Sequence, residues 1–152
     1  MKFHEPSVKK EIEMAQITPS DRILQIGCGA IPYSLIIISK MTQKELTGID
    51  NQGRSIQLAQ KFLQKYKHIH VEQYAGETYD VSDYDVILIS YGVGNIDAVL
   101  YNVLKNLKNT AKILFRKPVT VKSTYIDSII KQYSKKKIRL LLTQESILLM
   151  KQ

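Results

Sequence analysis

Two glycines and an aspartate are the residues of this sequence whose types and spacing indicate a binding site. Gly27 and Gly29 directly follow a short apolar run, residues 23–26, and Asp50 ends a second apolar segment 21 residues after Gly29. Glycines in a turn after a buried strand let the backbone come close to a ligand and present its N–H groups. An acidic side chain at the end of the next strand can accept hydrogen bonds from both hydroxyls of a ribose. The spacing therefore predicts a nucleoside site.

The apolar runs of the chain predict the elements that hold these residues in place. The predicted strands cover residues 23–26, 45–50, 68–73, 85–90, 111–115, 138–142 and 146–150. The predicted helices cover residues 8–16, 33–41, 54–65, 96–107 and 123–133. Strands that alternate with helices are typical of a parallel sheet covered on both faces, and the short connection at 143–145 permits only an antiparallel hairpin. We therefore predict an α/β fold with a Rossmann-like, doubly wound, mostly parallel seven-stranded sheet and a C-terminal antiparallel hairpin.

Side-chain types also predict how some helices begin, end and face. Pro32 lacks a backbone N–H and is expected at the first position of the second helix, where that group is not needed. Asn95 is expected to cap the fourth helix with its side chain. Phe62 is expected to face the core from the third helix, and the lysines at 135–137 to end the last helix.

Length and composition limit the class of protein. The chain has 152 residues, which we treat as a single domain, 1–152, with residues 1–19 forming an N-terminal helix and lead-in. Cys28 is the only cysteine, so we expect neither a disulfide framework nor a metal site. Residues 1–6 lack the apolar core of a signal peptide, and the longest apolar run, 35–38, is too short to span a bilayer. We expect a soluble, cytoplasmic protein without membrane contact.

The net charge of +8 is concentrated in the last third of the chain. Residues 1–100 contain 10 Lys and Arg against 12 Asp and Glu, whereas residues 101–152 contain 12 against 2. A basic region can bind nucleic acid, an anionic substrate or an acidic partner, or can simply keep the surface solvated. Three cations, Arg116, Lys117 and Lys122, follow the fifth predicted strand on the binding-site side, where they could meet an anionic acceptor or a phosphate. Lys131 and the lysines at 135–137 are expected at the opposite edge. A nucleic acid would have to contact both edges, so nucleic-acid binding is not favoured.

The combination of these features resembles a known family. A Gly-x-Gly turn follows the first predicted strand, an acid ends the second, Gly76 and Glu77 follow the third, and a hairpin closes the sheet. Over residues 20–152 this order is similar to the class I S-adenosylmethionine-dependent methyltransferase superfamily. The resemblance implies a transferase with S-adenosylmethionine as its cofactor.

The resemblance also implies roles for individual residues. The backbone at Gly27 and Gly29 would approach the amino-acid part and the ribose of the cofactor, and Asp50 would accept from both ribose hydroxyls. Glu77 would accept from the adenine amino group. Gln25 stands where the family often has Asp or Glu, so its contact to the methionyl amine would be weaker or made through water. The residues alone leave open that Asp50 only caps the next helix and that Glu77 is a solvated loop acid.

A narrower resemblance rests on the turn after the first strand. Residues 27–34 follow the pattern Gly-x-Gly-x-x-Pro-x-Ser, which is similar to nicotianamine synthases and their relatives. Those enzymes transfer the aminocarboxypropyl group of the cofactor in place of its methyl group. Their large N-terminal helical domain has no counterpart in the short segment before residue 20, so the resemblance supports cofactor binding better than that reaction. Pro32 in place of a third glycine argues against a nicotinamide dinucleotide.

Tyr91 and Tyr33 are the candidates for lining an acceptor pocket. Tyr91 lies in the loop after the fourth strand, where acceptor-binding groups occur in this fold, and Tyr33 follows the glycine turn; either can instead be an ordinary packed tyrosine. We expect a methyltransferase whose acceptor the sequence does not identify. The alternatives are aminocarboxypropyl transfer, or a non-catalytic nucleoside-binding module that docks an acidic partner or RNA. We also expect a second copy or a protein partner to cover the carboxyl edge of the sheet.

Overall fold

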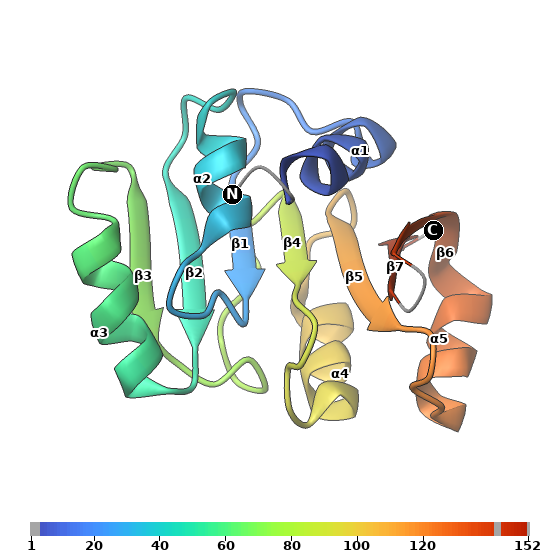
Figure 1. The fold of residues 1–152 in the computed structure, drawn as a ribbon. Helices are drawn as coiled ribbons and strands as arrows, with labels where there is room; N and C mark the ends of the chain where they lie inside the picture. The colour runs from blue at the N-terminus through green and yellow to red at the C-terminus, as the bar shows by residue number, and fades with distance from the viewer. Residues whose placement is uncertain (1–3, 142–143, 152) are drawn as a thin grey trace.

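One seven-stranded sheet flanked by helices forms the computed structural model, which describes residues 4–141 and 144–151 (Figure 1). The strands are β1 Ile23–Ile26, β2 Leu46–Asp50, β3 Ile69–Gln73, β4 Val86–Ile89, β5 Lys112–Pro118, β6 Ser134–Leu141 and β7 Gln144–Met150. The helices are α1 Glu5–Ala15, α2 Tyr33–Ser39, α3 Gly53–Phe62, α4 Ile96–Asn106 and α5 Thr124–Tyr133. None of the helices in the described part of the chain is long and apolar enough to cross a membrane.

The strand order is β3-β2-β1-β4-β5-β7-β6. The first five of these strands run parallel, and β7 lies antiparallel between β5 and β6. The predicted doubly wound sheet with an antiparallel hairpin is thus confirmed. The order reverses at β1, which pairs with β2 on one side and with β4 on the other. Ligands of such sheets bind in the crevice beyond the carboxyl ends of the strands at this reversal.

Two apolar layers hold helices against the two faces of the sheet. One layer joins α1 and α2 to the sheet, and the other joins α4 and α5 to it (Figure 1). Successive residues of β1 contribute to opposite layers: Ile23 belongs to the α1 and α2 side, and Leu24 to the α4 and α5 side. Because side chains alternate along a strand, Gln25 points toward the α1 and α2 side. Gln25 can therefore contact side chains that lie between the sheet and α1.

The structure corrects two predictions about helix starts. Pro32 is not the first helical residue, because its ψ of 67° lies outside the helical range and α2 begins at Tyr33. Asn95 precedes α4 as predicted, but its side chain makes no capping hydrogen bond. Its φ of 51° lies in the left-handed region, so its backbone belongs to the turn that precedes the helix.

Two further predictions about packing are wrong. Phe62 is 41% exposed instead of buried, and its ring contacts the Tyr33 ring edge-on, with 6.5 Å between centroids. The lysines at 135–137 lie in β6 and not at the end of α5. Strand β6 begins directly after α5. Its pairing with β7 is irregular between Ser134 and Lys136, where the chain changes from helix to strand. Of the predicted hairpin connection at 143–145, residues 144 and 145 belong to β7, which begins at Gln144, and residue 143 lies outside the described residues.

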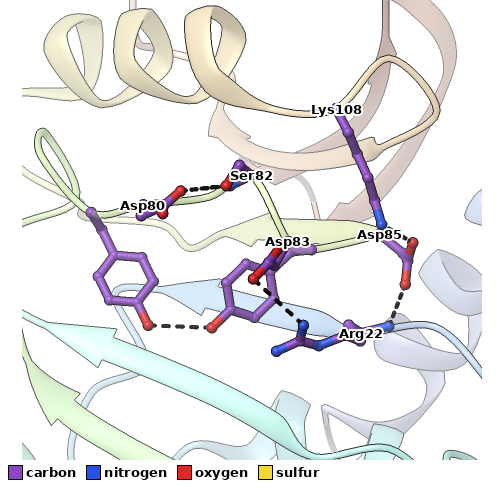
Figure 2. Close-up of polar contacts among 8 residues, drawn as sticks. Arg22, Asp80, Ser82, Asp83, Asp85 and Lys108 are labelled. Carbon is purple, nitrogen blue, oxygen red and sulfur yellow. Dashed lines mark hydrogen bonds and ion pairs between the residues drawn. The ribbon is translucent and has the colours of Figure 1, made fainter.

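The amino-terminal edge of the sheet is tied together by a polar cluster (Figure 2). The backbone N–H of Arg22 donates to Asp85 Oδ2 over 2.7 Å, and Lys108 pairs with Asp85 Oδ1 at 2.6 Å. The Arg22 guanidinium lies 3.8 Å from the carboxylate of Asp83. These contacts fix the starts of β1 and β4 to each other, so the edge that lies opposite the binding crevice is held by side chains.

Candidate functional site

A cavity of about 240 Å³ lies beyond the carboxyl ends of β1, β2 and β4. It contains the nucleoside-site residues that the sequence predicts, together with Tyr91, and we call it the nucleoside cavity. Its lining residues are Ile26, Gly27, Gly29, Ile49, Asp50, Asn51, Gln52, Ser55, Tyr74, Gly76, Glu77, Tyr91, Gly92, Val93, Gly94 and Val99. The structure therefore brings Gly27, Gly29, Asp50 and Glu77 to one place.

The glycine turn forms one wall of this cavity by backbone geometry. Gly27 and Gly29 have φ values of 79° and 69°, which favour glycine. The N–H groups of Gly27 and Cys28 both donate to the carbonyl of Ile49, at 2.8 and 3.0 Å. A Cβ at Gly27 would lie 2.6 Å from Val93 Cγ2, whereas a Cβ at Gly29 would meet no atom within 4 Å. Gly27 is thus needed for packing, and Gly29 leaves open space on the cavity side.

Asp50 stands at the end of β2 and organises the turn around it. Its Oδ2 accepts from the Gly29 N–H at 3.0 Å, and its Oδ1 accepts from the Gln52 N–H at 3.0 Å. Helix α3 is preceded by Gln52, whose side chain makes no capping hydrogen bond, so Asp50 holds the turn before the helix and is not its cap. A carboxylate oxygen can accept more than one hydrogen bond, so both oxygens can still accept from a diol. The turn and the ribose hydroxyls can share this one carboxylate.

The segment after β3 forms another wall of the nucleoside cavity. The amide of Asn102 on α4 donates to the carbonyls of Gly76 and Tyr79, at 2.9 and 3.0 Å, and so fixes the loop that carries Glu77. Tyr74 also lines the cavity and is 44% exposed, with its ring edge-on to Tyr79. Tyr74 is not among the residues that the sequence predicts for this site, although its position directly after β3 indicates that it lies at this edge.

A second cavity, of about 380 Å³, lies on the α1 and α2 side of the glycine turn. Tyr91 lines both cavities, so they meet at this residue. The lining residues are His4, Ser7, Val8, Gln25, Ile31, Tyr33, Ser34, Tyr91, Arg116, Leu140 and Gln144. Gln25, Tyr33 and Tyr91 are thus brought together here, while Glu77 and Asp50 lie in the nucleoside cavity.

Gln25 is buried in the wall of the second cavity. It is only 4% exposed, and its Nε2 donates to Ser90 Oγ over 2.8 Å. Its Oε1 has no hydrogen-bond partner among the described residues. A buried acceptor without a partner loses the hydrogen bonds that it makes to water in the unfolded chain, which is costly.

Arg116 does not stand free beyond the fifth strand, as the sequence analysis expected, because β5 continues to Pro118. Its Nε donates to Glu11 Oε1 at 2.9 Å, and its Nη2 donates to Glu11 Oε2 at 2.6 Å and to Ser34 Oγ at 2.9 Å. The side chains of Arg116 and Glu11 are 12% and 1% exposed. Lys117 points to the opposite face, where its Nζ lies 3.8 Å from Glu145. The side chains of Arg116 and Lys117 therefore lie on opposite faces of the sheet, and each pairs with a different carboxylate.

Glu11 is a residue that the sequence analysis missed. It follows Val8 by three positions, on the face of α1 that is buried against the sheet. A carboxylate within an apolar helical stripe requires a buried cation, and this was the available signal. The sequence did not reveal that the cation would be Arg116, which lies 105 residues away.

The aromatic and thiol groups near the turn are not poised to act as bases or nucleophiles. Tyr33 stacks on His4 with 5.4 Å between ring centroids, and the Tyr91 hydroxyl donates to the carbonyl of Glu145 at 3.4 Å. Burial raises the pKa of Tyr91 to about 12. Burial, helped by the charge of Asp50, raises the pKa of Cys28 to about 12. Both groups therefore stay protonated near neutral pH.

Metal-ligating side chains do not gather around either cavity. Within residues 4–141 and 144–151, no three His, Cys, Asp or Glu side chains lie close enough together to hold a metal ion. The polar groups of the cavities are instead backbone N–H groups, carboxylates, hydroxyls and amides. This donor set fits a nucleoside such as the adenosyl part of S-adenosylmethionine.

Comparison with known proteins is consistent with this geometry. The family model of a methyltransferase domain matches residues 17–149. No curated protein matches the chain in sequence. Among solved structures, the YcgJ protein from Bacillus subtilis is 22% identical, with a TM-score of 0.68 over 84% of this chain and 56% of that one.

Two further structures are similar in fold. MtNAS, a nicotianamine synthase, solved as a mutant with S-adenosylmethionine, is 15% identical, with a TM-score of 0.84 over 99% of this chain and 62% of that one. An RNA methyltransferase from Salinibacter ruber, solved with S-adenosyl-L-homocysteine, is 12% identical, with a TM-score of 0.74 over 95% of this chain and 90% of that one. The chain thus spans about three fifths of the length of the YcgJ protein and of MtNAS. It belongs to the methyltransferase-domain family and has the class I S-adenosylmethionine-dependent methyltransferase fold.

Proposed function

We propose that this chain binds S-adenosylmethionine across the two cavities and transfers its methyl group to an acceptor. The observation that carries the proposal is the joint position of Gly29, Asp50 and Glu77 in one cavity beyond β1 and β2. A carboxylate fixed by two backbone N–H groups is rigid, so it meets a diol without losing side-chain entropy on binding. The family match over residues 17–149 supports the same cofactor.

The residues of this chain contribute mainly positioning. The sulfonium group of the cofactor supplies an activated methyl group, so the rate depends on holding the acceptor in line with it. Tyr91 lies where the two cavities meet and keeps its proton near neutral pH, so it can orient groups by hydrogen bonding without acting as a base. Tyr33 and its partner His4 form an aromatic wall of the second cavity. These side chains suit an acceptor that enters from the α1 side.

Aminocarboxypropyl transfer is a second candidate. It is favoured by the match to MtNAS, whose structure is also solved with MTA and tNA, at a TM-score of 0.84 over 99% of this chain. The Gly-x-Gly-x-x-Pro turn at residues 27–32 supports it as well. The products separate the candidates: methyl transfer releases S-adenosylhomocysteine, and aminocarboxypropyl transfer releases methylthioadenosine. Ligand binding without either product would indicate a non-catalytic module.

A second copy or a protein partner over the carboxyl edge is part of this proposal. The nucleoside cavity lies beyond the carboxyl ends of β1, β2 and β4, and Tyr74 and Tyr91 are part of its lining. Coverage would exclude water from the reacting groups. Sedimentation velocity with and without cofactor measures self-association, and full activity of a strictly monomeric protein would contradict this point.

The nucleoside site is tested by calorimetric titration with S-adenosylmethionine, S-adenosylhomocysteine, methylthioadenosine and NAD. We expect the three adenosyl ligands to bind and NAD not to bind. Asp50→Asn removes the charge from the ribose contacts and should weaken all three ligands at least about tenfold, because hydrogen bonds to charged groups contribute about 1.5–3 kcal/mol. Asp127→Asn, at an exposed position on α5, is the matched control and should bind like wild type. Equal affinity of the two variants would overturn the assignment of Asp50.

A further inference from the structure

A third cavity, of about 330 Å³, is lined mainly by the segment that joins β3 to β4. We call it the tyrosine pocket, and its lining residues are Arg22, Tyr74, Tyr79, Asp80, Asp83 and Tyr84. Among the described residues, only Tyr74 lines both this pocket and the nucleoside cavity, and none lines both this pocket and the second cavity. The transfer reaction proposed above gives the tyrosine pocket no role.

The tyrosine pocket lies where a helix is missing from the sheet. Residues 74–85 cross from β3 to β4 without a helix, whereas α2, α3 and α4 connect the other successive parallel strands. Ile69 and Val71 of β3 pack toward α1 and α2, so His70 and Glu72 point to the opposite face, where both are exposed. A loop with three tyrosines therefore covers the part of this face that a helix covers elsewhere.

The charge of this region differs from that of the rest of the chain. Residues 68–104 contain six Asp and Glu and no Lys or Arg, although 22 of the 152 residues are Lys or Arg. In the pocket, the two carboxylates of Asp80 and Asp83 face the single guanidinium of Arg22, which leaves one net negative charge. Hydrogen bonds from Ser82 lower the pKa of Asp80, so this carboxylate is ionised near neutral pH. The pocket therefore attracts a cation and repels an anion.

The three tyrosines form a continuous row of rings. The rings of Tyr74 and Tyr79 meet at 80°, with 5.0 Å between centroids. The rings of Tyr79 and Tyr84 are 6.3 Å apart, and their hydroxyl groups form a hydrogen bond over 3.2 Å. Burial, the contact with Tyr84 and the charge of Glu72 raise the pKa of Tyr79, so its ring stays neutral. The face of a neutral aromatic ring attracts a cation, and several such rings together recognise alkylated ammonium ions.

A cation of the chain itself already occupies one of these rings. The guanidinium of Arg22 lies 5.5 Å from the centroid of the Tyr84 ring and 3.8 Å from the carboxylate of Asp83 (Figure 2). No Lys or Arg of the described residues lies over the ring of Tyr74 or Tyr79. The volume that remains beside Arg22 is at the lower end of the range for small-molecule sites. The unoccupied rings thus have room for a small ligand.

We propose that the tyrosine pocket binds a small alkylated ammonium ion, with its alkyl groups against the rings of Tyr74 and Tyr79 and its charge balanced by Asp80 and Asp83. Such an ion neutralises the net charge of the lining. Its alkyl groups also spread the charge over an apolar surface, so it loses less hydration on binding than a bare ammonium ion does. The site is independent of which group the protein transfers.

An NMR titration of the protein without adenosyl ligand tests the proposal, in about 0.15 M NaCl to screen exposed charges. Choline carries the alkylated ammonium group, 3,3-dimethyl-1-butanol has the same shape without the charge, and ammonium chloride has the charge without the alkyl groups. We expect choline to bind at least about tenfold more tightly than either, with the largest shifts at the lining residues. Equal binding of the alcohol would indicate a merely apolar cavity, and equal binding of ammonium a merely acidic surface. Either result, or no binding of choline, would overturn the proposal.

Variants of Tyr74 test the role of the rings. Tyr74→Leu removes one ring and should weaken choline about two- to fivefold, the effect of one exposed contact between a cation and a ring. Tyr74→Phe keeps the ring and should bind choline like wild type. Tyr101→Leu is the matched control, because Tyr101 is 58% exposed on α4 and has Lys105 5.7 Å from its ring centroid. Wild-type affinity of Tyr74→Leu would contradict the proposal.

A second pair of variants tests the carboxylates. Asp80→Asn keeps an oxygen that can accept from Ser82 but removes the charge, so choline should bind about two- to fivefold more weakly, the effect of one exposed ion pair. Asp127→Asn, at an exposed position on α5, is the control and should leave choline binding unchanged. The same loss in both variants would show that choline responds only to the net charge of the protein, and the assignment to the tyrosine pocket would be wrong.

Discussion

The nucleoside cavity and the second cavity meet at Tyr91 but are built from different parts of the chain. Two glycines with left-handed φ and the carboxylate of Asp50, which accepts from two backbone N–H groups, shape the first. Side chains from α1, α2, β1 and β5 shape the second, and its central ion pair joins residues 105 positions apart. The first cavity is therefore encoded locally, whereas the second depends on the complete tertiary structure.

This difference predicts that the two cavities respond differently to substitution. A change in the glycine turn strains the backbone that lines the nucleoside cavity, so it should alter ligand binding as well as stability. A change in the ion pair leaves a charge buried beneath α1, and its effect is felt first in the stability of the whole protein.

The largest expected effect comes from removing the cation of the second cavity. Arg116→Met leaves the carboxylate of Glu11 buried at 1% exposure without a partner. We expect the free energy of unfolding to fall by about 3–5 kcal/mol, measured by urea denaturation. Glu11→Gln in the same chain should recover most of that loss, because it removes the unpaired charge. A single variant as stable as wild type would show that the pair does not matter for folding.

The two glycines of the turn should differ in how much they contribute to stability. Gly27→Ala forces a left-handed φ and brings Cβ to within 2.6 Å of Val93 Cγ2, so we expect a loss of about 2–3 kcal/mol. Gly29→Ala has the same backbone strain without a clash and should cost about 1 kcal/mol. Gly94→Ala, which has neither feature, is the control. Urea denaturation measures all three, and equal losses at Gly27 and Gly29 would contradict the packing role of Gly27.

Gln25 offers a substitution that should weaken ligand binding but not folding. Gln25→Met keeps the shape of the side chain and removes the buried oxygen that lacks a partner among the described residues. The hydrogen bond to Ser90 is lost as well, so the unfolding free energy should change by less than about 1 kcal/mol in either direction. A fall of more than that in thermal or urea denaturation would show that Gln25 is held mainly for structure.

The sequence was sufficient to predict the fold and the gathering of Gly27, Gly29 and Asp50 beyond the ends of β1 and β2, because both depend on local patterns. The apolar runs gave the strand positions, and the spacing from Gly29 to Asp50 placed two neighbouring strand ends at one edge. The helix ends were less predictable. Pro32 and Asn95 directly precede their helices. Their backbone angles, however, are those of the preceding turns, and neither side chain makes a capping hydrogen bond.

Partners that are distant in the sequence could not be predicted in the same way. From the sequence, Arg116 was expected to belong to a basic surface, because Lys117 and other cations are its neighbours along the chain. Its pairing with Glu11 depends on α1 lying across β5, a packing arrangement that no local pattern specifies. Phe62 likewise continued the apolar stripe of its helix, yet α3 ends there at the edge of the sheet and leaves the ring partly exposed.

The smallest effect is expected at the opposite edge of the sheet, which serves as a reference for both cavities. Burial alone would raise the pKa of Asp85, but the hydrogen bond from the Arg22 N–H and the hydrogen bond and charge of Lys108 outweigh it and lower that pKa (Figure 2). A lowered pKa in the folded state means that these contacts stabilise the protein above about pH 4, the ordinary value of an aspartate, and that this stability is lost as the pH falls through the folded-state pKa. Asp85→Asn should therefore reduce the unfolding free energy by no more than about 1 kcal/mol at pH 7 and flatten its decline below about pH 4. Urea denaturation between pH 3 and pH 7 measures both effects.

Because Asp85 touches neither cavity, ligand affinity at pH 7 should stay at the wild-type value; a change would mean that the two edges of the sheet are coupled.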